Sequence, residues 1–291
     1  MLHYLSRKDR LFVIAVAVCL AAVAAAAWFL FPSLLPAVLA GFSTVFLVFY
    51  LLQLYRRLLI QLEQQRDTVI ISQTNHYAQM EAALSLSLPL QPEVPLPTFR
   101  GWAASPDFLL ETVREVNRLR PDTVLETGSG ASTIIIGLYL KKAGRGKLIS
   151  LEHSAGYFEK TRAMLELHGL EGTVELVLAP LSEVTIEGEK WKWYDLNTAA
   201  LPERIDLIVV DGPPEHIQKE ARFPAIPLLR ERIKDGTVIL VDDGRRDGEK
   251  AAVERWLGLL PGFSMDYLPL EKGAFRVHGH AANETGDADS V

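Results

Sequence analysis

The residues best suited to bind a nucleotide-like ligand lie in one short stretch, TVLETGSGAS, at residues 123–132. A β-branched apolar run reaches the acid Glu126 and is followed at once by Gly128 and Gly130. Glycines allow a backbone to approach a ligand closely, and the helix-like sequence that follows offers free N–H groups at its start. The stretch therefore predicts a nucleotide-type site between a strand and a helix.

The spacing of acids and glycines narrows the kind of nucleotide. A nicotinamide-binding turn needs G-x-G-x-x-G, and Thr133 stands where the third glycine belongs. This spacing, and the lack of an identifiable catalytic set, disfavours nicotinamide-dependent redox chemistry. A second acid, Glu152, ends the next predicted strand, 26 positions after Glu126. A carboxylate there accepts two hydrogen bonds at once, which suits the hydroxyl pair of a ribose.

Three aspartates follow two further predicted strands. Asp211 comes after the apolar run 205–210, and Asp242 with Asp243 comes after 237–241. Carboxylates that meet at one sheet edge repel each other unless a cation neutralises them, and oxygen ligands suit Mg²⁺, Ca²⁺ or Mn²⁺. We therefore predict these three residues as a metal site. The alternative is that Asp242 or Asp243 caps the following turn, while Asp211 touches the cofactor or the substrate.

Several other polar and aromatic side chains each allow two interpretations. His216 and Lys219 lie just past Asp211 and are either general-base candidates or surface residues. Arg222 either binds an anionic substrate group or braces its loop. The aromatic cluster of Trp191, Trp193 and Tyr194 forms either a lid or stacking wall over the site or a small satellite core. Two arginines, Arg245 and Arg246, lie near the site mouth.

Strand and helix patterns alternate through the part of the chain that must position these residues. Strands are predicted at 123–126, 147–151, 173–178, 205–210 and 237–241, and helices at 105–118, 132–142, 155–168, 225–233 and 248–259. The last two strands, 264–270 and 274–277, flank a Glu-Lys-Gly turn and read as a hairpin. This order predicts an α/β fold, a doubly wound Rossmann-like sheet finished by an antiparallel hairpin.

The N-terminal region has a different character. Residues 11–31 and 34–55 are two uncharged apolar runs, each long enough for the roughly 20 residues of a membrane-spanning helix. A cleaved signal peptide is disfavoured, because the first run exceeds the usual apolar core of roughly 7–15 residues and a second run follows directly. The prediction is two transmembrane helices in a hairpin; two buried core helices are the alternative.

Charge distribution predicts the orientation of this hairpin. Arg7, Lys8 and Arg10 precede the first run, while Arg56 and Arg57 follow the second. Positive charge at both ends places both ends in the cytoplasm. We therefore expect a multi-pass protein of a bacterial-type inner membrane, with its N-terminus and its folded domain on the cytoplasmic side and the lipid bilayer as a partner.

Four segments follow from this pattern. Residues 1–57 form the membrane hairpin, and 58–97 form an amphipathic connector helix and a Pro-rich linker. The connector either lies on the membrane surface, pairs with a copy of itself to give a homo-oligomer, or is a plain solvated helix. Residues 98–279 form the nucleotide-binding domain. The small, polar residues 280–291 are predicted to be a disordered tail.

Composition excludes some classes of function. The chain has 291 residues and a net charge of −6, which argues against nucleic acid as a partner. Its single cysteine excludes an internal disulfide and fits a reducing compartment.

The combination of these motifs resembles the class I S-adenosylmethionine-dependent methyltransferases, most closely the subgroup labelled methyltransferase domain 24. The residues that carry the resemblance, which covers about 98–279, are Glu126–Gly130, the strand end at Leu151–His153, Asp211-Gly-Pro-Pro214 and the final hairpin. Polyamine synthases share the fold, but their acid pattern is not evident.

The resemblance implies S-adenosylmethionine as cofactor and a role for each matching residue. Glu126 and the Thr127–Gly130 backbone would face its methionine part, and Glu152 its ribose. His153 and the loop ending at Leu181 would border the adenine. The full implied cofactor set is Glu126, Thr127, Gly128, Ser129, Gly130, Ser132, Glu152, His153 and Leu181. Ser132 stands where relatives carry a third glycine, and Ala179-Pro180 where many carry an acid.

The aspartates also resemble the divalent-metal site of catechol-type O-methyltransferases, with Asp-Asp in place of the usual Asp-Asn pair. The implied function is a membrane-anchored methyltransferase that acts on oxygen, with Asp211 and His216 as catalytic residues and Mg²⁺ or another divalent cation at Asp211, Asp242 and Asp243. Its acceptor would be small, glycan or lipid-linked, and membrane-proximal. The alternative is a non-catalytic membrane scaffold that keeps the fold.

Overall fold

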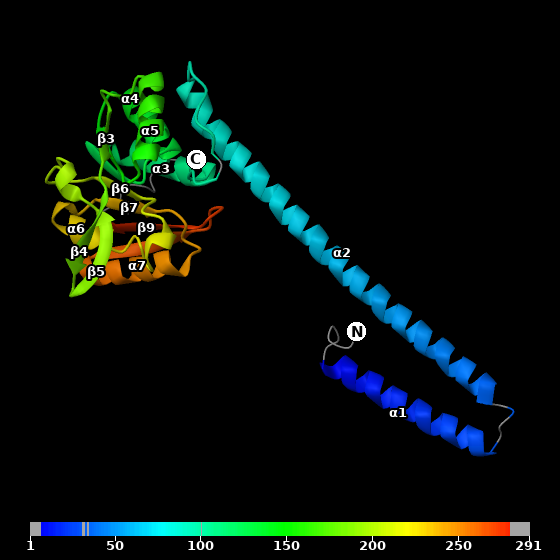
Figure 1. Cartoon of the computed structure of the whole chain (residues 1–291). Helices are drawn as coiled ribbons and strands as arrows, with labels where there is room; N and C mark the ends of the chain where they lie inside the picture. The colour runs from blue at the N-terminus through cyan, green and yellow to red at the C-terminus, as the bar shows by residue number, and fades with distance from the viewer. Residues whose placement is uncertain (1–6, 31–32, 34, 100, 280–291) are drawn as a thin grey trace. The chain divides into compact units, whose positions relative to one another are not determined.

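The computed structural model describes residues 7–30, 33, 35–99 and 101–279 (Figure 1). The predicted tail at 280–291 and most of the turn predicted between the two apolar runs lie outside the described residues. The chain divides into two compact units, Met1–Gln73 and Thr74–Val291.

Two helices form the N-terminal region. α1 spans Arg7–Leu30, and α2 spans Leu35–Leu90 as one helix of 56 residues. The apolar run and the amphipathic connector, predicted as separate pieces, are thus continuous. No glycine or proline interrupts residues 56–88, and most of these residues favour helix, so nothing in the sequence breaks the ladder.

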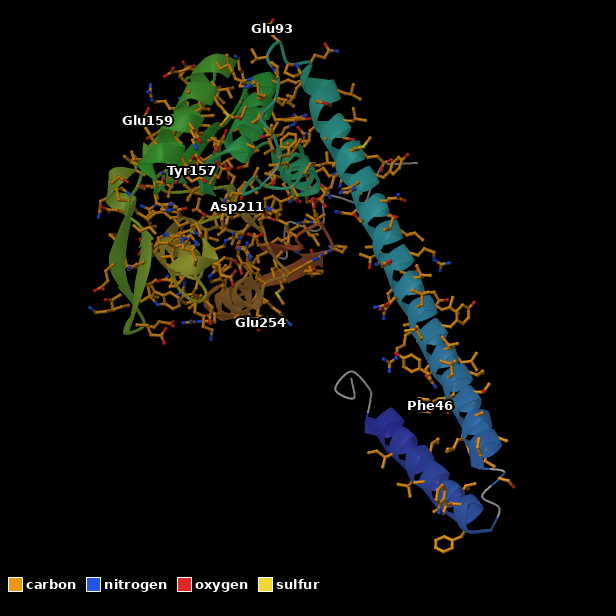
Figure 2. All side chains as sticks on the ribbon, turned by 45° about the vertical axis from the view of Figure 1, so that its right-hand side comes forward. Phe46, Glu93, Tyr157, Glu159, Asp211 and Glu254 are labelled. Atoms are coloured by element: carbon orange, nitrogen blue, oxygen red, sulfur yellow. The ribbon has the colours of Figure 1, made fainter. Side chains whose placement is uncertain are left out.

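Among the described residues, one helix is long and apolar enough to cross a membrane by length and composition. It is Pro36–Leu90, whose most apolar window has a mean hydropathy of 2.0 and is not buried. The side chain of Phe46 projects from this part of α2 and is 44% exposed (Figure 2). The described part of α1 gives only a shorter apolar helix, Ile14–Val23. The prediction of a second span is therefore supported, whereas that of a first span is not.

The end of α2 belongs to the second unit and packs against it. Leu86 is fully buried, and its carbonyl accepts a hydrogen bond of 3.0 Å from the hydroxyl of Tyr139. The ammonium group of Lys142 donates to the carbonyl of Pro89. Leu96, in the Pro-rich segment, packs on the same core. The last turns of the connector are therefore anchored on the chain's own domain.

A sheet of seven strands forms the centre of the second unit, in the order β3-β2-β1-β6-β7-β9-β8 (Figure 1). Its strands are β1 (Thr123–Thr127), β2 (Lys147–Glu152), β3 (Val174–Leu178), β6 (Leu207–Val210), β7 (Val238–Val241), β8 (Phe263–Leu268) and β9 (Ala274–Gly279). The first five are parallel, and β9 pairs antiparallel with both β7 and β8. The predicted doubly wound sheet with a final antiparallel hairpin is confirmed.

Helices cover both faces of this sheet. One core contains α3 (Pro106–Leu119), α4 (Ala131–Ala143), α5 (Ala155–His168) and the end of α2. The other contains α6 (Ala225–Leu229) and α7 (Asp247–Leu259). Neighbouring residues of one strand, such as Leu207 and Ile208 in β6, enter opposite cores. Burial on both faces explains why β6 and β7 are uninterrupted apolar runs.

A second, two-stranded sheet was not predicted. β4 (Leu181–Ile186) and β5 (Glu189–Tyr194) form an antiparallel hairpin whose turn residues, Glu187 and Gly188, both have positive φ. Apolar and charged residues alternate on both sides of that Glu-Gly pair, which is a hairpin signal in the sequence. Trp191, Trp193 and Tyr194 all belong to the core that contains α6 and α7.

Candidate active site

A cavity of about 640 Å³ opens at the carboxyl edge of the parallel strands. Its walls come from the loops after β1, β2, β6 and β7. Between β1 and β6 the strand order reverses direction, and open α/β sheets bind ligands in the crevice at that point. Asp211, which follows β6, lies inside the domain, whereas Glu159 and Glu254 lie on its outside (Figure 2).

The cavity brings together most of the predicted residues. Those that line it are Gly128, Ser129, Gly130, Ser132, Glu152, His153, Asp211, His216 and Asp243. Glu126, Thr127, Leu181 and Asp242 do not line it. Nine of the thirteen predicted residues therefore share one cavity, and the other four are not among the residues that line it.

The glycine turn needs glycine for reasons of space. Gly128 has φ +91°, and a Cβ atom there would lie 3.0 Å from the carbonyl oxygen of Asp211. The loops after β1 and β6 are in backbone contact at this point. The hydroxyl of Thr127 strengthens the same contact by donating to the carbonyl of Gly212 at 3.1 Å. The side chain of Thr127 thus joins the two loops, and Thr127 is not among the residues that line the cavity.

Glu126, which the resemblance placed against the methionine part of the cofactor, is not among the residues that line the cavity. It is fully buried, and its Oε2 accepts hydrogen bonds from the hydroxyls of Thr133 at 2.5 Å and Ser150 at 2.6 Å. Thr133 in turn accepts a 2.9 Å hydrogen bond from the backbone N–H of Gly130. Burial raises the pKa of Glu126, although the hydrogen bonds to its carboxylate act in the opposite direction and lower the pKa. Its position makes it a support for the glycine turn.

Glu152 occupies the position expected of a ribose-binding acid. Its side chain is buried, and Oε2 accepts from the N–H and the hydroxyl of Ser129 at 3.1 and 3.0 Å. Oε1 accepts from the N–H of Ser154 at 2.8 Å and lies 3.2 Å from Nδ1 of His153. Burial alone would raise the pKa of Glu152, but the contacts with His153, Ser154 and Ser129 outweigh it and lower the pKa. Glu152 is therefore held as a carboxylate at the cavity wall.

Tyr194 contributes a polar atom that the sequence did not assign. It lines the cavity from β5, is 1% exposed, and packs edge-on against His153 with ring centroids 5.9 Å apart. Its hydroxyl has no hydrogen-bond partner among the described residues. Burial raises the pKa of Tyr194 well above its ordinary value, so the hydroxyl is a neutral donor. An unpaired buried hydroxyl is costly, which marks it as a ligand contact.

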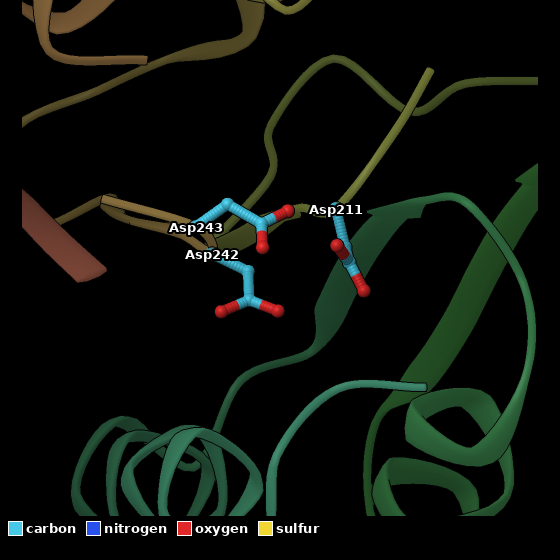
Figure 3. A group of neighbouring side chains, drawn as sticks. All are labelled: Asp211, Asp242 and Asp243. Atoms are coloured by element: carbon cyan, nitrogen blue, oxygen red, sulfur yellow. The ribbon is translucent and has the colours of Figure 1, made fainter. Parts of the chain in front are cut away.

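The three aspartates lie together beyond the ends of β6 and β7, as predicted (Figure 3). Carboxylate oxygens of Asp211, Asp242 and Asp243, one from each, lie within 4.8 Å of one another. Burial and the neighbouring charge of Asp242 raise the pKa of Asp211 well above its ordinary value, although Arg222 opposes the shift. Burial also raises the pKa of Asp242, with Asp243 adding to the effect.

Protein cations already lie among these acids. Arg222, 3% exposed, donates from Nη2 to Asp243 at 2.6 Å and to Asp211 at 3.2 Å, and from Nη1 to the carbonyl of Asp242 at 2.6 Å. Arg246 lies 2.9 Å from Asp243, and the ammonium group of Lys272 lies 3.7 Å from Asp242. Arg222 therefore braces the loop ends that carry Asp211 and Asp243, and it also lines the cavity.

The remaining candidates lie at the mouth of the cavity or outside it. His216 is exposed and lines the mouth, whereas the side chain of Lys219 is 90% exposed and pairs with Glu220. Arg246 lines the cavity. Trp102, which the sequence did not single out, also lines the cavity while 72% exposed. An exposed tryptophan at the edge of a ligand cavity offers an apolar surface to an incoming acceptor.

Comparison with known proteins identifies the domain. Residues 125–244 match the family model described as "Methyltransferase domain". The matched segment is 120 of the 291 residues and contains most of the residues of the candidate site. This match agrees with the resemblance to methyltransferases that the motifs indicated. Among curated proteins, no sequence match is found.

Solved structures similar to the methyltransferase include three relatives with low identity. The methyltransferase PaMTH1 of Podospora anserina, bound to SAH, is 17% identical with a TM-score of 0.48, covering 68% of this chain and 87% of its own. An O-methyltransferase of Bacillus cereus in complex with SAH is 17% identical (TM-score 0.43; coverage 69% and 90%). TomG of Streptomyces achromogenes, an O-methyltransferase in complex with SAM, is 18% identical (TM-score 0.44; coverage 69% and 89%). Likeness at this level says nothing about what this chain acts on.

Proposed function

We propose that this methyltransferase transfers a methyl group from S-adenosylmethionine to an acceptor hydroxyl at the membrane surface. The observation that carries the proposal is one cavity that has Glu152 on one side and Asp211 on the other. Glu152 is an ionised acceptor suited to ribose hydroxyls, and Asp211 is a carboxyl group suited to take a proton. A cofactor and an acceptor can therefore meet between them.

The residues that hold the cofactor are those on the β1 and β2 side. Glu152 accepts the ribose hydroxyls, and the backbone of Gly128–Gly130 faces the amino-acid portion. The buried hydroxyl of Tyr194 donates to the cofactor from the cavity floor. When bound, S-adenosylmethionine supplies a methyl group on a positively charged sulfur, which keeps the bonding electron pair and becomes the neutral thioether of S-adenosylhomocysteine.

Asp211 acts at the other end of the cavity as the general base. It takes the proton of the acceptor hydroxyl while that oxygen forms its bond to the methyl carbon, so charge is conserved across the step. A raised pKa suits this task because it makes the carboxylate a stronger base than an ordinary aspartate. The exposed His216 at the mouth is placed to contact the acceptor or to pass the proton to solvent.

Membrane attachment is the second part of the proposal. The apolar part of α2 spans the bilayer of a bacterial-type inner membrane, and Arg56 and Arg57 hold the following segment on the cytoplasmic side. The end of α2 packs on the catalytic domain, so the helix that carries the membrane segment continues into that domain. A lipid-linked, glycan or small membrane-proximal acceptor fits an enzyme attached to the membrane in this way.

The test of the function is transfer of labelled methyl groups from S-adenosylmethionine to membrane extracts. We expect a labelled product with the wild-type protein and none with Asp211→Asn, while both proteins bind S-adenosylhomocysteine. The competing hypothesis is a non-catalytic scaffold, which the inward-turned Glu126 and the absence of an acid at Ala179-Pro180 favour. Cofactor binding without any labelled product in any extract would support the scaffold.

A further inference from the structure

Arg222 lies in the loop between β6 and α6 at the centre of a dense group of charges. Its Nη2 is bonded to Asp211 and Asp243, and its Nε lies 3.5 Å from Glu249. Side chains of four carboxyl groups and three basic groups meet here: Asp211, Asp242, Asp243, Glu249, Arg222, Arg246 and Lys272. Arg222 is the only one of the described basic residues in this group that contacts three of the acids.

The backbone around Arg222 is fixed by several independent contacts. The carbonyl of Arg222 accepts from the N–H of Ala225 at 3.1 Å. The next residue, Phe223, is fully buried, and its carbonyl accepts a hydrogen bond of 2.8 Å from the indole of Trp256. The guanidinium group is therefore held in place from its own backbone as well as by the acids around it.

A single nitrogen bridges the two carboxylates that a metal would bridge. Nη2 lies 3.2 Å from Oδ1 of Asp211 and 2.6 Å from Oδ2 of Asp243. A Mg²⁺ or Ca²⁺ ion bonded to the same two oxygens, at about 2.0–2.6 Å from each, would fall where this nitrogen lies. Because both are positively charged, the guanidinium and the ion exclude each other.

We propose that Arg222 is the resident cation of this active site and takes the place of a divalent metal ion at Asp211 and Asp243. It neutralises the acid group, fixes the orientation of the Asp211 carboxylate toward the cavity, and makes methyl transfer independent of metal. The catalytic part of this inference rests on the proposed function, whereas the exclusion of metal does not. The structure thus assigns Arg222 as a positioning residue.

The proposal predicts that loss of the guanidinium opens a metal site. The experiment is titration of the full-length protein in detergent with Mn²⁺, followed by electron paramagnetic resonance of the free ion. Wild-type protein should bind no Mn²⁺ at this site, and Arg222→Met should bind one equivalent. Removing a residue that only hydrogen-bonds to a metal ligand usually lowers metal affinity roughly 10–100-fold. Asp243 would be a direct ligand, so adding Asp243→Asn to Arg222→Met should weaken Mn²⁺ binding by at least as much.

Arg222→Met also leaves buried carboxylates uncompensated, so its fold must be checked by circular dichroism. If that variant does not fold, wild type and Arg222→Lys decide the question, because Lys keeps the charge. Neither should bind Mn²⁺, and S-adenosylhomocysteine binding by wild type should be unchanged by EDTA. One equivalent of Mn²⁺ on wild-type protein, lost in Asp243→Asn, would overturn the proposal. Failure of the methyltransferase function would instead appear as absent S-adenosylhomocysteine binding.

Discussion

Thr133 donates a hydrogen bond of 2.5 Å to Glu126, a buried glutamate that is not among the residues lining the cavity. The same hydroxyl accepts from the N–H of Gly130, which places it between the acid and the turn. Glu126, the acid of the glycine motif, therefore affects ligand binding indirectly, by fixing the conformation of the glycine turn. This arrangement separates two glutamates that look equivalent in sequence: Glu126 supports the turn, and Glu152 lines the cavity.

Glu126→Gln tests this separation. The amide oxygen of Gln can accept the same two hydroxyls, so the variant should fold and keep its affinity for S-adenosylhomocysteine. Thr133→Val should weaken that affinity and lower the free energy of unfolding by about 1–3 kcal/mol, because it leaves buried polar groups unpaired. Calorimetry and denaturant titration measure both effects. A folded Glu126→Gln protein without affinity would show that Glu126 contacts the cofactor directly.

The raised pKa of Glu126 gives the same variant a pH signature. A buried acid with a raised pKa contributes stability that is fully present below its ordinary value of 4.5 and is lost as the pH rises from there through the folded-state pKa. Gln does not titrate, so the stability of Glu126→Gln relative to wild type should increase with pH above 4.5. Denaturant titrations at a series of pH values measure this difference; a difference independent of pH would contradict the burial argument.

Tyr194→Phe should separate binding from stability. The Tyr194 hydroxyl is buried without a partner among the described residues, so its removal should leave the thermal midpoint unchanged or higher. Affinity for S-adenosylhomocysteine should fall by about 0.5–1.5 kcal/mol, the usual net value of one hydrogen bond. Calorimetry and thermal denaturation on the same preparation test both statements. A lower midpoint with unchanged affinity would assign the hydroxyl a structural role.

Asp211 should control the pH dependence of methyl transfer. Burial and Asp242 raise its pKa, and a general base must be ionised to accept a proton, so the rate should rise with pH through a value above 3.8, its ordinary pKa. Asp211→Asn should abolish this rise along with most of the activity, while S-adenosylhomocysteine binding persists. Initial rates across pH with an active extract fraction provide the measurement. A variant with the wild-type pH profile would remove Asp211 from catalysis.

Truncation should show where the catalytic unit begins. Removing residues 1–73 should release a folded protein from the membrane fraction, because Leu86 and its contacts remain. Removing residues 1–97 should also release the protein but destabilise it, since burial of a leucine alone is worth about 1.5–3 kcal/mol. Cell fractionation and thermal denaturation distinguish the two truncated proteins. Equal thermal midpoints would show that the end of α2 adds nothing to the domain.

The sheet and most of its helices were predictable because their patterns are local. β6 and β7 are apolar runs buried on both faces, and α5 begins and ends at the predicted residues Ala155 and His168. The end of α2 was harder, because its packing on Tyr139 depends on a contact between residues 53 positions apart. The β4–β5 hairpin was missed although its Glu-Gly turn is a hairpin signal, because its tryptophans were interpreted as part of a lid or a satellite core and not as strand residues.

The candidate site was predictable in its location and less so in the direction of its side chains. Strand ends fix which residues come to the sheet edge, so Glu152, Asp211 and Asp243 were found together. Whether a buried acid turns toward the cavity depends on partners such as Thr133, which no spacing rule includes. The acid group likewise suggested a metal, because the sequence does not show that Arg222 folds back into it.

Binding of S-adenosylhomocysteine to wild type and Glu152→Ala, measured by calorimetry, tests the central claim most directly. Glu254→Ala is the matched control, because Glu254 lies on the outside of the domain (Figure 2). The account predicts binding by wild type and the control, and at least a roughly tenfold loss, or 1.4 kcal/mol, in Glu152→Ala. No binding by folded wild-type protein, or equal binding by all three, would contradict it.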